Sequence, residues 1–210
     1  CGAASGEACL HTGAQHGDTI EFESIENYRD KSTGAFVFLR DANVYVPKDT
    51  NLGNKRSVIP RGVTVTLCLD GNTLIESPQT ATRYTEGFAI EDGGTLTLCD
   101  CKGTGSLVNF NDNDFTVYDT GTLNMYGGTL ERSDSTPPIR LIGTFNMYGG
   151  AITGNYGRCA VEVTDGRINL YGGVIDGNYT NDISSYKSNV ELSPGAVINI
   201  PDKLYPGTRV

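Results

Sequence analysis

The chain repeats one phrase three times, as GTLNMYGGTLERS at 121–133, GTFNMYGGAITGN at 143–155 and GRINLYGGVIDGN at 166–178. The glycines that open the three copies lie 22 and 23 residues apart. A repeat of this length is typical of solenoid proteins, in which every copy forms one coil of the same shape. The fold therefore depends on the secondary structure that one unit of about 22 residues can adopt.

Each unit contains three short runs in which apolar and polar residues alternate, the pattern expected of half-buried strands. In the first run of the middle unit, Phe145 and Met147 are predicted to point one way and Asn146 the other. The second run follows the glycine pair, as Ala151–Thr153, and the third precedes the next phrase, as Val161–Val163. The unit therefore predicts three strands joined by turns.

Less regular copies of these runs extend the repeat toward both ends of the chain. The first run recurs as Gly62–Cys68, Gly94–Cys99 and Gly195–Ile200, and the third recurs as Phe88–Glu91 and Phe115–Tyr118. Together they predict about six to seven coils, between about residue 60 and residue 200.

Two architectures, the leucine-rich repeat and the parallel β-helix, have this repeat length, and the turn residues distinguish between them. A leucine-rich repeat often carries a helix in its second half, but here that half contains Ser135–Pro138 or a Gly-Asn pair, which break helices. We therefore expect an all-β, right-handed parallel β-helix with three strands per coil and about 4.8 Å between coils. Glycines at its corners supply the backbone angles that tight turns need.

Four regions are expected along the 210 residues. Residues 1–35 form a partly irregular leader that contains cysteine and histidine, 36–60 form strands that cap the open end, 61–200 form the β-helix, and 201–210 extend beyond it. Because the chain begins at Cys1 with neither a methionine nor a signal peptide, we expect it to be a piece of a larger protein, continuous with other domains.

Net charge and hydropathy limit the classes of partner that the chain is expected to bind. The net charge of −9 argues against nucleic acid and against anionic membrane surfaces, because both require a basic face. No apolar run approaches the roughly 20 residues that span a bilayer. Neither nucleic-acid binding nor membrane insertion is expected.

Three of the six cysteines fall where neighbouring coils should meet. Cys68 and Cys99 take the same position on successive coils, and Cys101 follows in a turn. Two interpretations stay open. The cysteines are reduced and act as small apolar members of a ladder, or a disulfide joins Cys68 to Cys99 or Cys101.

The leader contains both histidines of the chain. Cys1, Cys9, His11 and His16 supply two thiolates and two imidazoles, which are the ligands of a tetrahedral zinc site. The gap between the two cysteines is wider than in the usual zinc knuckle. A disulfide between Cys1 and Cys9, or an irregular end, is the alternative.

Further motifs occur in a characteristic order. After the leader come VTLCLDGNTL at 65–74, GGTLTLCDCKGTGSL at 93–107 and repeats such as GTFNMYGGAITGN at 143–155. Over roughly residues 36–200 this order resembles the glycine-rich β-helix repeats of large secreted and cell-surface proteins from Gram-positive, often gut-dwelling, bacteria. The resemblance implies a pectin-lyase-like fold and an extracellular, secreted or wall-attached location, but it implies no reaction.

A charged row is the best candidate for catalysis. Polysaccharide lyases and hydrolases on parallel β-helices use carboxylate clusters on one outer face, and lyases also use calcium and a basic residue. The exposed middle position of the third run reads, coil by coil, Ala89, Thr116, Arg140, Glu162 and Glu191, with Asp165 at the corner beyond. Arg140, Glu162, Asp165 and Glu191 would be the catalytic or calcium-binding residues. An arginine beside a glutamate is also an ordinary cross-strand pair, and no histidine falls on a coil, so a non-catalytic role is favoured.

Aromatic and amide rows are the best candidates for binding. Stacked columns are predicted for Tyr126, Tyr148 and Tyr171, for Tyr156 and Tyr179, and for Asn124, Asn146 and Asn169. Flat rings can stack on sugars, and amides supply donors and acceptors. We therefore expect a non-catalytic adhesion or carbohydrate-binding module that contacts a glycan or a host or cell-wall component. If the columns only brace the coils, the alternative is a rigid spacer without a ligand.

Overall fold

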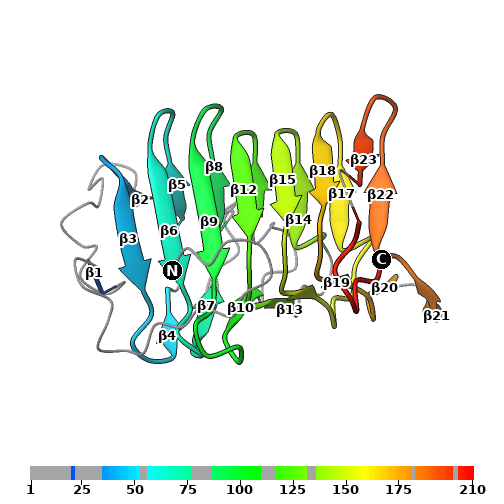
Figure 1. The fold of residues 1–210 in the computed structure, drawn as a ribbon, viewed down its shortest axis with the longest axis horizontal. Helices are drawn as coiled ribbons and strands as arrows, with labels where there is room; N and C mark the ends of the chain where they lie inside the picture. Colours follow the sequence, from blue (N-terminus) through cyan, green and yellow to red (C-terminus); the bar gives the residue numbers. More distant parts are fainter. Residues whose placement is uncertain are drawn as a thin grey trace.

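The computed structural model describes residues 20–21, 35–52, 56–76, 87–109, 117–131, 136–180, 183–200 and 203–210. All regular elements in these ranges are β-strands, which stack side by side into a rod (Figure 1). In this described part of the chain, no helix is long and apolar enough to cross a membrane.

Three parallel sheets run along the rod. Sheet 1 contains β1 (Ile20–Glu21), β3 (Ala42–Tyr45), β6 (Thr64–Cys68), β9 (Thr95–Cys99), β12 (Thr122–Met125), β15 (Thr144–Met147), β18 (Arg167–Leu170) and β23 (Val197–Asn199). Sheet 2 contains β4 (Thr50–Asn51), β7 (Thr73–Glu76), β10 (Ser106–Asn109), β13 (Thr129–Glu131), β16 (Ala151–Ile152) and β19 (Val174–Ile175). Sheet 3 contains β2 (Phe36–Val37), β5 (Ser57–Ile59), β8 (Phe88–Ile90), β11 (Val117–Asp119), β14 (Ile139–Leu141), β17 (Val161–Val163) and β22 (Val190–Leu192). A separate antiparallel pair joins β20 (Tyr179–Thr180) to β21 (Ile183–Lys187).

About seven successive coils build the rod within the described ranges, and each complete coil contributes one strand to every sheet. The first coil contains β2, β3 and β4, and the last contains only β22 and β23. The three-strand parallel β-helix predicted from the sequence is therefore confirmed. The described residues within 36–60, expected as a cap, pair into all three sheets and belong to the first coil and the start of the second.

The core is a set of apolar columns along the axis, because pairing in register places equivalent residues above one another. Leu123, Phe145 and Ile168 form one column, and Met125 and Met147 belong to a second; all five are at most 1% exposed. Burying a side chain of this size contributes about 1.5–3 kcal/mol. Because the column continues from coil to coil, this stabilisation is distributed along the rod.

The two glycines of each Tyr-Gly-Gly serve different purposes at the corner. The second takes a left-handed backbone conformation, with φ of +82° at Gly150 and +90° at Gly173, which other residues rarely adopt. The first approaches the coil below: a Cβ on Gly149 would lie 2.6 Å from the backbone oxygen of Tyr126. The glycine pair is a corner, as predicted.

The third strand of the fourth coil differs from the expected one. Its middle residue is Tyr118, which pairs with Arg140. Tyr118, rather than Thr116, therefore occupies the column of the charged row. The next residue, Asp119, is turned into the core and is 0% exposed.

The C-terminal extension returns along the edge of sheet 2. Arg209 forms a parallel bridge with Val174, and the backbone N–H of Tyr205 donates to the backbone oxygen of Tyr171 at 3.0 Å. The extension therefore lies against the sixth coil. In the seventh coil Ile198, which continues a core column, is 37% exposed.

Candidate functional site

Three tyrosines form the continuous stack predicted from the sequence, here called the tyrosine row. The ring centroids of Tyr126 and Tyr148 are 4.5 Å apart with their planes at 9°, and those of Tyr148 and Tyr171 are 4.5 Å apart at 13°. Each side chain is half-buried at the corner where sheet 1 ends. The rings cover one another's faces, so a sugar cannot stack on the face of Tyr148. Edges and hydroxyl groups are what the row offers to a ligand.

The central ring of the row is held in its neutral form. Burial, followed by the electrostatic effect of the phenol groups of Tyr126 and Tyr171, raises the pKa of Tyr148 to about 12. A tyrosine hydroxyl is already protonated at neutral pH, and this shift keeps that of Tyr148 protonated in more alkaline solution as well. A protonated hydroxyl both donates and accepts hydrogen bonds, as the hydroxyl groups of a glycan do.

An asparagine row runs beside the tyrosines on the outward side of sheet 1. Asn146 donates from Nδ2 to Oδ1 of Asn124 at 2.8 Å, and Asn169 donates to Oδ1 of Asn146 at 2.7 Å. At its ends, Asn124 donates to Oγ1 of Thr97 at 3.3 Å and Asn199 donates to Asn169 at 3.1 Å. Asn146 thus uses one N–H and one carbonyl lone pair within the row, which leaves one of each for a ligand.

Replacing Asn146 with alanine is expected to lower the free energy of unfolding by about 1–3 kcal/mol, because both neighbouring amides lose a partner. Asn199→Ala, at the exposed end of the row, removes a single bond and is expected to cost about 0.5–1.5 kcal/mol. Urea unfolding of both variants measures the difference. Equal costs for the two variants would contradict a bracing role for the asparagine row.

The shorter aromatic column is also present, at a different corner. The rings of Tyr156 and Tyr179 are 5.9 Å apart with their planes at 24°, and they follow the strands of sheet 2. Beside them, Nδ2 of Asn155 donates to Oδ1 of Asn178 at 2.8 Å, and both amides are 1% exposed. This pair therefore lies over a buried amide ladder and does not extend the tyrosine row.

The charged row is assembled in sheet 3 and is ion-paired. Arg140, Glu162 and Glu191 lie side by side, with Arg140 Nε 3.8 Å from a carboxylate oxygen of Glu162. Arg158 lies 3.7 Å from Glu162 and also contacts Glu191, which raises the pKa of Arg158. Asp165 is exposed at the corner that follows. Each glutamate faces a guanidinium group, as in ordinary cross-strand pairs.

In the described ranges, no three or more histidine, cysteine, aspartate or glutamate side chains are grouped so that they could hold a metal ion. The charged row therefore offers no calcium site of that kind. The candidate zinc ligands Cys1, Cys9, His11 and His16 lie outside the described residues. Zinc in the leader stays a prediction.

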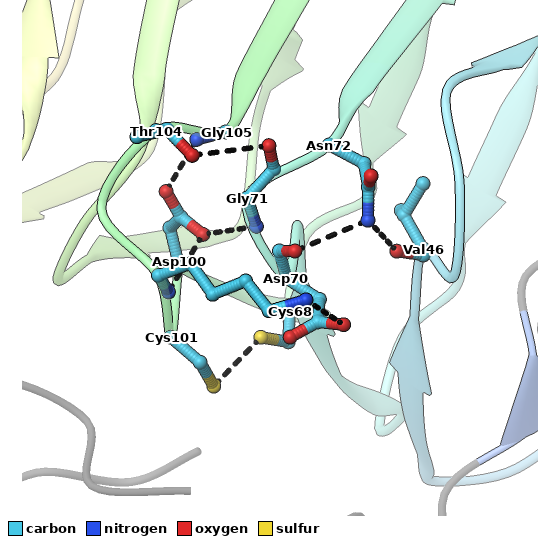
Figure 2. A network of polar contacts seen from close by, with 10 residues as sticks. Val46, Cys68, Asp70, Gly71, Asn72, Asp100, Cys101, Thr104 and Gly105 are labelled. Carbon is cyan, nitrogen blue, oxygen red and sulfur yellow. Dashed lines mark hydrogen bonds and ion pairs between the residues drawn. The ribbon is translucent and has the colours of Figure 1, made fainter. Parts of the chain in front are cut away.

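A polar corner between the second and third coils was not predicted (Figure 2). Asp100, only 9% exposed, accepts hydrogen bonds from the backbone N–H groups of Gly71 at 2.7 Å and Gly105 at 2.6 Å. Lys102 Nζ lies 3.1 Å from a carboxylate oxygen of Asp70. The signal in the sequence is an aspartate and a glycine that follow the cysteine in both VTLCLDGNTL and LTLCDCKGTG.

The tyrosine row and the asparagine row thus each continue over successive coils on one side of the rod. Both belong to the strands and corners of sheet 1, and both repeat on successive coils. No protein-family model, curated protein or solved structure gives a significant match to this chain.

Proposed function

We propose that the chain is a non-catalytic extracellular module for adhesion or carbohydrate binding within a larger bacterial surface protein. The tyrosine row and the asparagine row form its ligand face. The observation that supports this proposal is continuity, because equivalent rings recur 4.5 Å apart on successive coils. A linear glycan, or another polymer of the cell wall or host surface, that lies along the rod meets the same groups on each coil.

The proposed contact is polar and uses the edges of the rings. Tyr148 presents a neutral hydroxyl group, and Asn146 keeps one N–H and one lone pair outside its row. Sugar hydroxyl groups can bond to both, directly or through water. The net charge of −9 favours a neutral polymer over a strongly anionic one.

Glycan and mucin arrays, probed with and without calcium, test the proposal. Binding is expected, and Tyr148→Phe is expected to weaken it about three- to tenfold, because the substitution removes one hydroxyl group but keeps the stacked ring. Tyr118→Phe makes the same chemical change on sheet 3 and should leave binding unchanged. Equal affinities of the wild-type protein and Tyr148→Phe would place the ligand elsewhere.

A rigid spacer is the second candidate, because the tyrosine rings and the asparagine amides already have partners within their own rows. Ring faces cover ring faces, and amides bond to amides along the rod. A spacer would bind nothing on the arrays, and Tyr148→Ala would lower thermal stability without changing adhesion. Loss of binding in Tyr148→Phe at unchanged thermal stability would exclude the spacer.

A further inference from the structure

Three cysteines belong to the corner between the second and third coils. Cys68 ends β6 and Cys99 ends β9, and the two residues pair in register. Cys101 follows in the turn, where its Sγ lies 3.0 Å from Sγ of Cys68 (Figure 2). The thiol of Cys99 donates instead to the backbone oxygen of Leu67, at 3.6 Å. Among the hydrogen-bond contacts of these thiols, the one that joins two sulfur atoms is between Cys68 and Cys101.

We propose that Cys68 and Cys101 form a disulfide that ties the second coil to the third, while Cys99 stays a thiol. The sulfur atoms of a disulfide are about 2.05 Å apart. Closing the bond from the observed 3.0 Å requires the two sulfur atoms to approach by about 1 Å, which is within reach of side-chain rotation. The inference is independent of the ligand face on sheet 1.

The side chains on both sides of Cys101 contact the coil that carries Cys68. On one side, Asp100 accepts a hydrogen bond from the N–H of Gly71, at 2.7 Å. On the other side, the ammonium group of Lys102 pairs with Asp70 at 3.1 Å. The turn therefore holds the Cys101 sulfur in place against its partner, so little conformational freedom has to be lost when the bond forms.

The surroundings of each thiol indicate its role in thiol–disulfide exchange, the reaction that forms the bond. The neighbouring thiol of Cys99, and then that of Cys101, lowers the pKa of Cys68 well below its ordinary value. Interaction with Cys68, and then burial, raises the pKa of Cys99. Cys68 is therefore the thiolate that closes the protein disulfide in the second step of the reaction, and Cys99 stays protonated. Cys159, elsewhere in the rod, is buried, and burial raises its pKa to about 12.

The reaction needs a small-molecule disulfide such as oxidised glutathione as the oxidant. Cys101 is partly exposed, and its thiolate attacks one sulfur of that disulfide, which releases the first glutathione thiolate. The Cys68 thiolate then attacks Sγ of Cys101, and the second glutathione thiolate leaves. The two protons from the cysteines end on the two glutathione thiols. One protein disulfide forms while one glutathione disulfide is reduced.

Oxidation of the folded chain in a glutathione redox buffer, followed by alkylation and peptide mapping, tests the pairing. Trypsin places Cys68 in peptide 62–83 and places Cys99 and Cys101 together in peptide 84–102. A cross-link between these two peptides is expected. Fragmentation of the cross-linked species should locate the bond at Cys101 and alkylation at Cys99. This measurement on the wild-type chain does not depend on any variant folding.

Two matched variants separate the candidate partners. Cys99→Ser should keep the cross-link, and Cys101→Ser should lose it. Oxidation should raise the Tm of the wild-type protein by roughly 5–15 °C, since the bond closes a loop of 33 residues, and should leave the Tm of Cys101→Ser unchanged. A bond at Cys99, a cross-link that survives in Cys101→Ser, or free Cys68 in the oxidised wild-type protein would overturn the proposal.

Discussion

Replacing Asp119 with leucine is expected to stabilise the protein at pH 8 by about 2–4 kcal/mol. Asp119 points into the core at a position that is apolar in the coils on either side, where Ile90 and Leu141 pair with it. Neither of its carboxylate oxygens accepts a hydrogen bond of ordinary distance and angle. Burial raises its pKa to about 7, and the backbone N–H groups at the following corner offset this only in part. A leucine would complete the apolar column.

The sign of the pH dependence follows from the two pKa values of Asp119. The folded value of about 7 lies above the unfolded value of about 3.9. Below about pH 4 the carboxyl group is protonated in both states and its ionisation costs nothing. Between about pH 4 and pH 7 it is ionised only in the unfolded chain, so stability falls as pH rises. Above pH 7 the full cost, up to about 4 kcal/mol, is present.

Urea unfolding at pH 4 and pH 8 measures this effect. The stability difference between Asp119→Leu and the wild-type protein should be larger at pH 8 than at pH 4. Asp165→Asn, which changes an exposed carboxylate at a corner, is the control and should show no such change. A difference that is the same at both pH values would show that folding does not raise the pKa of Asp119.

Replacing Gly143 with alanine is expected to destabilise the protein by at least about 3 kcal/mol. A Cβ at this position would lie 2.2 Å from the backbone oxygen of Gly121 and 2.7 Å from a backbone carbon of Thr120, in the coil below. Gly166 sits on Gly143 in the same way, with its Cβ position 2.7 Å from the Gly143 oxygen. These are backbone contacts, so only movement of the coils can relieve the clash.

Gly154→Ala is the matched control for Gly143→Ala. Gly154 has φ of +68°, and no atom lies within 4 Å of a Cβ added there. Its substitution should therefore cost only the backbone strain, about 1–2 kcal/mol. Thermal and urea unfolding compare the two variants. If Gly154→Ala lowers stability as much as Gly143→Ala, the close approach of neighbouring coils is not the reason why position 143 requires a glycine.

The sequence predicted the strands and the tyrosine row because both depend on local order. In β15, Phe145 and Met147 alternate with Asn146, and the structure buries the first two and leaves the amide on the surface. The stack that includes Tyr148 follows from repeat position alone, since equivalent residues of a parallel solenoid lie one strand spacing apart. At that spacing the neighbouring rings cover both faces of Tyr148, so its face is not open to a sugar.

The placement of β11 was wrong because hydropathy favoured another frame. An alignment that starts at Phe115 puts apolar residues inward, whereas the actual strand, Val117–Asp119, puts a carboxylate there. Counting back from Gly121 gives the observed frame, as Ile139–Leu141 precedes Gly143 by the same interval. An ionisable group in an apolar column violates the pattern from which strands are predicted, so only the pairing between coils reveals it.

By itself, the sequence determined the coil: its length, its three strands and its glycine corners, because alternation and turn chemistry act between residues that are near in the chain. Only the tertiary structure decided what each coil meets in the next. It placed the sulfur of Cys101 against that of Cys68, left no room for a side chain at Gly143 and buried Asp119 in the core. The physical reason is that backbones about 4.8 Å apart leave tolerances of an ångström or less, which residue spacing along the chain does not specify.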